Sequence, residues 1–575
     1  MLPAVKYNSL KTRYIVYSPD FNTRLVKFWT ALAIILGVMP IWFTSKEMWD
    51  GIIGSYAFDS NNWKIIKNWS IDSNWYISYG LFLICDAIHQ LTEIPYWVLF
   101  KFWITLLIFG IGYEAYKLAQ SLFGIHRETA IWLPALIFSF PVWYVFFSYM
   151  SMIGHLTCVW LALVGYRYFY NVRRPIQIIG VIFIAASFQL ASNCAFLIMI
   201  EFCRWLNREK YASWYFYKSL TILIVALLVF YLTRIAWPPV GTYIGYNKLL
   251  NPFVMENWRI YFQRIMFWAT WAVLLLPLIP TIFKLYRKQQ SSRSTTLQEL
   301  SAQWKIYISF ALLMIAVCAP YVAVGLASPF FVINLPSSTS LSAMLASNST
   351  LFSVWYGGWG ARHALLLMIV FVLFVGWTAQ CLMATAKTGV KNSSISQLFA
   401  IIITFNLVFL IPGHFAKLTR IAQEQTIIEV LKVVPQAPYG QINFIMDNKI
   451  DYLVSSYEAN YLLYQVYKAT HWFAYIMPDH PGIKRWVEQN RSLIFDKAKE
   501  SPVVIGEQNV MSDYNWNNRC MTVVRIHLPI LQLKDILWVA NFSPLNLPKA
   551  SLYPISTNCK GADPFWKTSH HLESQ

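Results

Sequence analysis

Carboxylates, tryptophans and asparagines alternate in one polar stretch of the chain, residues 45–95. A tryptophan ring offers an apolar platform to the face of a sugar, an amide bonds hydroxyl groups, and a carboxylate can take the proton of an attacking hydroxyl. The pattern fits a carbohydrate site, and it fits equally well an interfacial aromatic belt with solvated acids. Its candidate residues are Glu47, Trp49, Asp50, Asp59 and Asp72.

A second set of residues is cationic or carries an imidazole, and it lies in or beside loops between apolar runs. Cations that run against the usual bias toward the cytoplasmic side are candidates for binding an anion such as phosphate. The alternative for each cation is a snorkelling interfacial anchor, and for each histidine a hydrogen bond to the backbone. The set comprises Lys248, Arg259, Arg362, His155 and His363.

Signatures of soluble enzymes are absent from the sequence. The chain contains no GxxxxGK[ST] loop, no HExxH, no CxxC pair and no GxSxG turn. These motifs supply phosphate binding, zinc ligands and an activated serine, so ATP-driven transport and zinc-dependent hydrolysis lose their usual support. Whether a divalent metal is needed stays open.

The composition is that of a membrane protein. Of 575 residues, 57% are hydrophobic and 13% are charged, and the mean hydropathy is +0.44. Soluble domains carry about 25% charged residues, so most of the surface is expected to face lipid. The formal net charge of +19 is concentrated in short loops between apolar runs. Because the positive-inside rule requires that placement, we reject a nucleic-acid partner.

Apolar runs of about 20 residues, with a range of about 17–25, suffice to cross a bilayer. They predict an all-α polytopic membrane protein with about eleven transmembrane helices. The stretch 76–88 is shorter and contains Asp86, which favours an interfacial or re-entrant helix. Only Ser192 separates the fifth apolar run from the sixth, so these two spans form a tight hairpin or their boundary is partly mispredicted. The predicted spans are 28–44, 96–116, 129–148, 156–171, 175–191, 193–208, 217–235, 261–283, 305–325, 363–385 and 396–413.

Lysine and arginine positions orient these spans. With residues 1–27 in the cytoplasm, the cytoplasmic loops are basic, whereas 149–155 and 326–361 hold no Lys or Arg. An odd number of spans places residues 414–575 outside the cytoplasm, with enough chain for a small mixed α/β domain. A disulfide between Cys520 and Cys559 is permitted there, and the sequence does not decide whether it forms. The predicted organisation is a cytoplasmic segment 1–27, a membrane domain 28–413 and an extracytoplasmic domain 414–575.

This arrangement resembles the membrane-embedded C-type glycosyltransferase superfamily. The resemblance covers the membrane part of the chain and lies in Glu47 and Asp50 directly after the first span, in the stretch 95–124, and in the sequence from Gly358 to His363. Several of these families carry two adjacent acids in the first outer loop, and this chain does not.

The resemblance implies an inverting, hexosyltransferase-type enzyme in a bacterial inner membrane. It implies transfer of a sugar from a polyprenyl-phosphate carrier to an envelope glycan, such as O-antigen or lipopolysaccharide, or to a lipid-linked acceptor. Asp50 is implied as the base, with Glu47 second, and no cofactor beyond the donor follows. A transporter or flippase of lipid-linked sugars is one alternative, although no half-repeat is visible. An O-antigen polymerase is another, although such polymerases usually place their large outer loop late in the chain.

Overall fold

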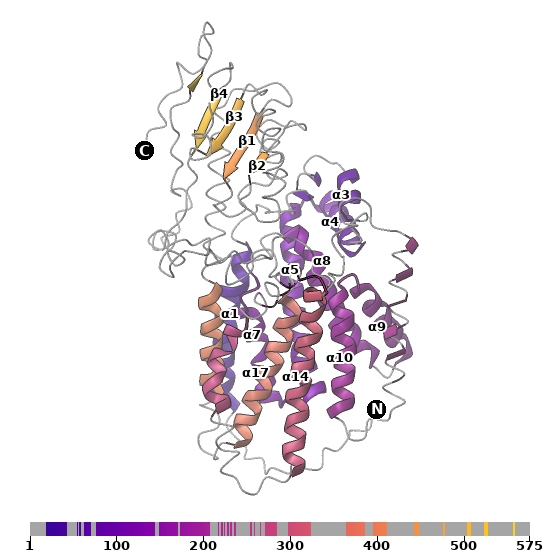
Figure 1. Cartoon of the computed structure of the whole chain (residues 1–575), viewed down its shortest axis with the longest axis vertical. Helices are drawn as coiled ribbons and strands as arrows, with labels where there is room; N and C mark the ends of the chain where they lie inside the picture. The colour runs from indigo at the N-terminus through magenta and orange to yellow at the C-terminus, as the bar shows by residue number, and fades with distance from the viewer. Residues whose placement is uncertain are drawn as a thin grey trace.

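The computed structural model describes residues 19–42, 54–55, 57–58, 63–70, 76–143, 149–170, 173–207, 271–283, 297–323, 364–385 and 395–410, short pieces between 217 and 265, and five strands between 442 and 557. The described helices pack side by side as a bundle, with α3 (Trp63–Ser70) and α4 (Tyr76–Thr92) beyond one end (Figure 1). We call this end, where α5 and α8 also begin, the α3/α4 end.

The first long helical run changes its winding before it ends. It consists of α1 (Pro19–Ala33), the π-helical segment η1 (Ile34–Val38) and the 3₁₀ turn η2 (Met39–Trp42). Gly37 in η1 lies directly against the backbone of Phe138, where a β-carbon would clash with the carbonyl of that residue. Only glycine permits this approach, so the altered winding brings η1 against α7 (Leu133–Ser139).

The remaining helices follow in chain order, and several are bounded by glycine or proline. α5 starts after Pro95 and ends at Gly124, which adopts the left-handed conformation typical of a helix C-terminus. The bounds are α5 (Tyr96–Phe123), α6 (Arg127–Ala130), α8 (Tyr149–Phe169), α9 (Arg174–Ser187), α10 (Ala191–Asn207), η5 (Ala272–Leu278), α14 (Leu297–Ala323), α17 (Leu365–Thr385) and an apolar helix Ile395–Leu410.

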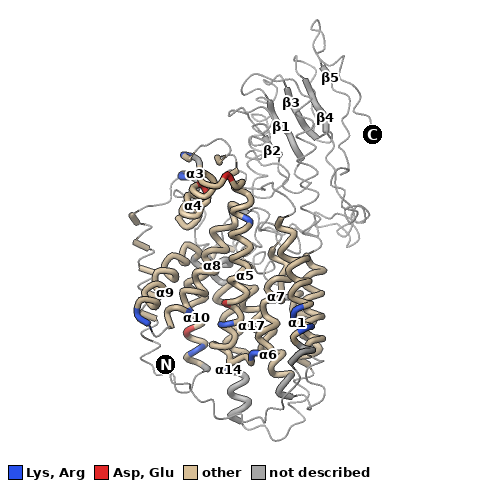
Figure 2. Tube along the Cα trace, turned by 180° about the vertical axis from the view of Figure 1, so that it is seen from behind, with Lys and Arg blue, Asp and Glu red and all other residues tan. Residues whose placement is uncertain are grey.

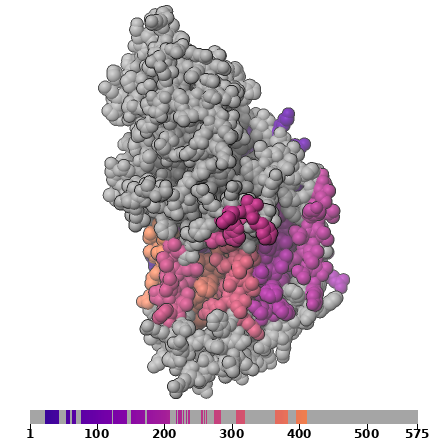
Figure 3. Space-filling view, in the orientation of Figure 1, coloured from indigo at the N-terminus to yellow at the C-terminus, as the bar shows by residue number. Residues whose placement is uncertain are grey.

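α5 shows why these helices suit a bilayer. Its outward face exposes large apolar side chains at Phe102, Leu106, Phe109 and Tyr113, spaced as one helical stripe. Figure 2 shows that the described helices carry few charges, and Figure 3 shows that they form a continuous band across one face of the molecule. An apolar stripe directed outward is stable against lipid and costly against water.

Within the part of the chain that the structure describes, three helices are long and apolar enough to cross a membrane: Thr23–Trp42, Tyr96–Ser121 and Leu365–Leu382. Four apolar helices are shorter: Arg174–Ser187, Val273–Phe283, Lys305–Cys318 and Ile395–Leu410. Described helices also lie at the other predicted spans in whole or in part. The membrane-protein class is thus supported, and the number of eleven spans stays a prediction.

The α8–α9–α10 region contains the predicted tight hairpin, with its turn moved. α9 ends at Ser187 and α10 begins at Ala191, so the turn lies at 188–190 rather than at Ser192. Asn193 closes it by donating to the carbonyls of Ser187 (2.9 Å) and Cys158 (3.0 Å). An apolar run does not reveal this boundary, because the turn residues Phe188 and Leu190 are themselves buried and apolar.

Five strands of the C-terminal region form one sheet in the order β2-β1-β3-β4-β5. The first four are parallel neighbours, and β5 is antiparallel to β4. Figure 1 draws the sheet beyond the α3/α4 end of the bundle. The strands are β1 (Ile442–Asp447), β2 (Tyr475–Met477), β3 (Val503–Glu507), β4 (Thr522–Ile526) and β5 (Ser556–Thr557), and the mixed α/β domain stays a prediction.

Candidate functional site

Of the ten predicted site residues, the structure describes His155. It is buried in the second turn of α8, with 6% of its surface exposed. The others lie outside the described residues: Glu47, Trp49, Asp50, Asp59, Asp72, Lys248, Arg259, Arg362 and His363. The described residues on either side of Glu47 and Asp50 contact the helices α5 and α8.

The acid-bearing stretch leaves the first helical run at Trp42. The indole Nε1–H of Trp42 donates to the hydroxyl of Thr105 on α5 at 3.1 Å, and that hydroxyl donates back to the carbonyl of Lys101 at 2.8 Å. Trp42 also packs edge-on against Trp97, with ring centroids 6.5 Å apart. The start of the stretch is therefore fixed to the first turns of α5.

The chain returns to the same turns of α5 at Phe58. This buried ring lies 4.4 Å from the ring of Tyr96 and 5.7 Å from that of Phe100, between centroids. Three residues earlier, the hydroxyl of Ser55 contacts the sulfur of Met150 at the start of α8, at 3.8 Å. Residues 43–53 lie outside the described residues. We call residues 43–53, which carry Glu47 and Asp50, the acid-bearing segment. Its two flanks are held at the beginnings of α5 and α8.

Lys101 lies between these two attachments and is fully buried. Its ammonium donates to the carbonyl of Ile41 at 2.7 Å and lies 5.6 Å from the ring centroid of Trp97. The Ile41 carbonyl belongs to the last turn of η2, whose carbonyls lack partners within the helix, so a cation is favourable there. A lysine in a membrane helix is costly and usually marks a functional or paired site.

His155 of α8 lies at a depth in the bundle similar to that of Lys101 on α5. The indole of Trp103, two residues after Lys101, donates to the hydroxyl of Thr157, two residues after His155, at 3.4 Å. The two helices begin at the same end and run in the same direction, so Lys101 and His155 lie at similar depth. This end of the α5–α8 pair thus combines a buried ammonium, a buried imidazole and the indoles of Trp42 and Trp97.

Asp86 and His89 make separate contacts at the corner between α4 and α5. Asp86 accepts from the hydroxyl of Tyr96 at 2.6 Å, and His89 Nδ1 bonds the carbonyl of Ile94 at 2.8 Å. Glu93, at this corner, takes a left-handed backbone conformation. The corner reverses the chain within three residues, and Asp86 and His89 support it through different partners.

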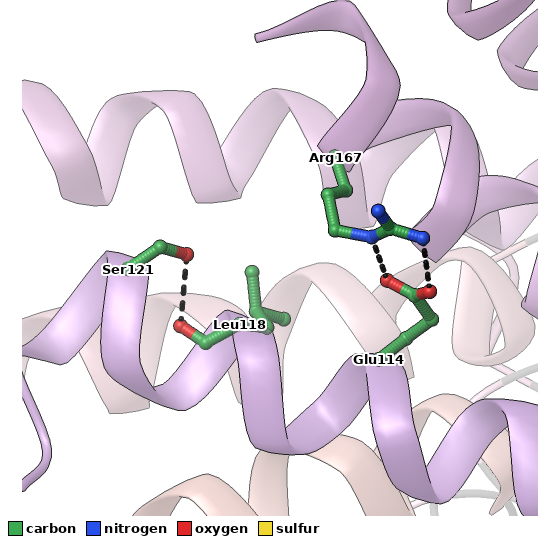
Figure 4. A network of polar contacts seen from close by, with 4 residues as sticks. All are labelled: Glu114, Leu118, Ser121 and Arg167. Atoms are coloured by element: carbon green, nitrogen blue, oxygen red, sulfur yellow. Dashed lines mark hydrogen bonds and ion pairs between the residues drawn. The ribbon is translucent and has the colours of Figure 1, made fainter. Parts of the chain in front are cut away.

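Charges nearer the opposite ends of α5 and α8 are paired across helices. Glu114 of α5 accepts two hydrogen bonds from Arg167 of α8, at 2.7 and 2.8 Å (Figure 4). The nearby bond from Ser121 to the Leu118 carbonyl stays within α5. Buried Glu201 of α10 accepts from Tyr166 of α8 at 2.6 Å, and Arg204 donates to the Tyr166 hydroxyl at 3.1 Å. These pairs join three helices.

Lys101 is the site residue that sequence reasoning missed. Averaging over the run 96–116 hides a single lysine among apolar residues, although an isolated charge inside a predicted span is itself a signal. Among the described residues, no cluster of three His, Cys, Asp or Glu side chains could hold a metal ion. The question of a divalent metal therefore stays open for the acids of the first loop.

No family model, no curated protein and no solved structure matches the chain.

Proposed function

We propose that this protein is a glycosyltransferase of a bacterial inner membrane. It moves a sugar from a polyprenyl-phosphate carrier to an envelope glycan or a lipid-linked acceptor, on the extracytoplasmic face. One observation carries the proposal: both flanks of the acid-bearing segment are attached to the turns of α5 that hold the buried Lys101. A buried cation and indole rings thus lie where the acid-bearing segment begins and ends, which supports binding of a lipid-linked sugar phosphate there.

The chemistry follows from these groups. The carboxylate of Asp50 takes the proton of the acceptor hydroxyl while its oxygen attacks the anomeric carbon. The bond from that carbon to the phosphate oxygen breaks, and the carrier phosphate leaves with the bonding electrons. Attack opposite the leaving group inverts the anomeric configuration. Positive charge near the phosphate stabilises the negative charge that develops there.

The position of the C-terminal sheet agrees with this proposal. Beyond the α3/α4 end of the bundle, the sheet lies on the same side as the attachments of the acid-bearing segment (Figure 1). A domain on that side is placed to receive an acceptor glycan. We infer that this end of the bundle faces away from the cytoplasm.

A purified-protein assay tests the assignment of the base. We expect Asp50→Asn to lower kcat for sugar transfer by at least about 100-fold, because a general base contributes about 10²–10⁴-fold. Glu47→Gln is the matched control in the same segment and retains more activity. Full transfer by a folded Asp50→Asn protein would reject Asp50 as the base. Uptake of labelled sugar lipid into vesicles, without any new glycosidic bond, would favour the flippase instead.

A further inference from the structure

We propose that the α5–α8 pair binds an anionic phospholipid at the end opposite the α3/α4 end, with the lipid phosphate against Lys117 and Arg167. The inference goes beyond the proposed function, because it concerns the other end of the bundle and involves no sugar transfer. Three observations carry it: two cations that share one tyrosine ring, an excess of positive charge around them, and an apolar stripe of α5 that leads to them.

Lys117 of α5 and Arg167 of α8 meet at the ring of Tyr113. The Lys117 ammonium lies 5.5 Å from the ring centroid, and the guanidinium carbon of Arg167 lies 5.8 Å from it. The ring of Tyr116 lies 5.5 Å from the same ammonium, and that of Tyr168 lies 4.7 Å from the same guanidinium. Cations are attracted to aromatic faces, and tyrosines are enriched at the level of lipid headgroups. The two cations are therefore held around one ring at the contact between the helices.

Positive charge exceeds negative charge at this cluster. Glu114 is the only acidic residue in α5, α8 and α9, and it accepts two hydrogen bonds from Arg167 (Figure 4). Lys117 is partly exposed, the Arg167 side chain is 38% exposed, and Arg174 is exposed at the start of α9, which packs against α8. One carboxylate of these helices thus accompanies three accessible cations. A phosphate diester complements this excess, as lipid phosphates do in basic pockets between membrane helices.

An apolar stripe of α5 leads to the cluster. Its exposed side chains are Phe102, Leu106, Phe109 and Tyr113. Lys117 follows Tyr113 by four residues and so lies on the same side of the helix. The stretch from Phe102 to Lys117 spans about 22 Å, at about 1.5 Å per residue. The hydrocarbon of one leaflet is about 15 Å deep, so an acyl chain can lie along the stripe while its phosphate reaches the two cations.

Ordinary anchoring of a lysine at the membrane surface predicts a different behaviour. A snorkelling lysine needs only a polar environment for its ammonium, so zwitterionic and anionic lipids serve it equally well. A site for an anionic phospholipid distinguishes the two, because its affinity depends on the charge of the headgroup. Each basic residue near an anionic lipid contributes about fivefold to that affinity. The response to headgroup charge therefore separates the two cases.

The test is thermal unfolding of the detergent-solubilised full chain with added dioleoylphosphatidylglycerol, dioleoylphosphatidylcholine or inorganic phosphate. A ligand of the folded protein raises its melting temperature. Phosphatidylglycerol should raise that of the wild type at least about 2 °C more than phosphatidylcholine does, and inorganic phosphate should leave it unchanged. Lys117→Met should melt as the wild type does without lipid and lose most of this lipid-dependent difference, whereas Lys117→Arg should keep it. Lys27→Met, which removes an exposed cation from α1, is the matched control and should also keep it.

Three outcomes would overturn the proposal. Equal stabilisation by the two phospholipids would leave the stripe as an ordinary lipid-facing surface. Equal losses in Lys117→Met and Lys27→Met would mean that the lipid responds to net charge and not to this cluster. Stabilisation by inorganic phosphate would assign the cations to a free anion. If Lys117→Met does not fold, Arg174→Gln takes its place with the same expected loss, and none of these results depends on sugar transfer.

Discussion

Arg167 and Glu114 form an ion pair in which the guanidinium donates two hydrogen bonds to the carboxylate. Two parallel hydrogen bonds, of 2.7 and 2.8 Å, join α8 to α5. The Glu114 side chain is 4% exposed and that of Arg167 38% exposed, so the carboxylate is desolvated more than the guanidinium. Removing the guanidinium therefore leaves the more deeply buried charge without its partner.

We expect Arg167→Met to destabilise the membrane domain more than Glu114→Gln does. The first change strands a buried carboxylate and costs about 2–3 kcal/mol, whereas the second leaves a guanidinium that reaches solvent and costs about 1 kcal/mol. Thermal unfolding in detergent measures both. Equal melting temperatures for the two variants and the wild type would contradict a stabilising role. Lys117→Met, also on α5, serves as the control.

At the level of single residues, the sequence singles out the acids at 47 and 50 because they directly follow an apolar run, and their role stays a prediction. Lys101 was overlooked, since a span is detected from the average of about 20 residues. The attachments of Trp42 and Phe58 to α5 depend on tertiary packing, which no local pattern contains.

Helices α8 and α9 pack closely through a glycine on each helix. A β-carbon on Gly165 would lie 2.9 Å from the Gly180 carbonyl oxygen, and one on Gly180 would lie 2.5 Å from the Phe169 backbone nitrogen. Small residues allow such approach, which supplies van der Waals contact where lipid leaves little hydrophobic driving force between helices. The two glycines thus set the spacing of this hairpin.

Gly165→Leu is expected to separate α8 from α9 and to destabilise the protein by about 1–3 kcal/mol, as overpacking does. Gly180→Leu should act similarly. Gly80→Ala on α4 is the control, because a β-carbon there meets nothing within 4 Å and the effect should stay within about 0.5 kcal/mol. Thermal unfolding of the variants in detergent measures the difference in stability. Wild-type stability for both leucine variants would mean that the hairpin tolerates wider spacing.

The ends of a helix are predictable from the sequence where a proline or a glycine bounds it. α5 begins after Pro95, where the predicted span 96–116 also begins. It continues to Phe123, seven residues beyond the predicted end, because Lys117 and Gln120 are polar yet helical and Gly124 supplies the stop. Hydropathy reports the apolar part of a helix, and capping residues report its end.

At the scale of the whole molecule, the pairs of Glu114 and Glu201 and the attachments of the acid-bearing segment lie toward opposite ends of the bundle. The pairs of Glu114 and Glu201 lie toward the end of α5, α8 and α10 at which these helices finish. Lys101, His155 and the attachments of the acid-bearing segment lie at the α3/α4 end, on the side of the C-terminal sheet (Figure 1). Such polarity suits an enzyme whose substrates arrive on one face of a membrane.

This arrangement predicts the location of residues 414–575. A fusion of alkaline phosphatase after Gln575 should be active, since that enzyme folds in an oxidising compartment, and a green fluorescent protein fusion at the same position should be dark. Fusions after Lys391, in a predicted cytoplasmic loop, should behave in the opposite way. A fluorescent fusion after Gln575 would reverse the proposed orientation and move the site to the cytoplasmic face.

Surface glycans of a strain that lacks the protein, complemented with wild type or Asp50→Ala, test the central claim most directly. Mass spectrometry should find one hexose-sized increment restored by the wild type and missing with the variant, at equal protein levels in the membrane. Identical glycans in the deletion strain and in both complemented strains would contradict a glycosyl transfer that depends on the acid-bearing segment.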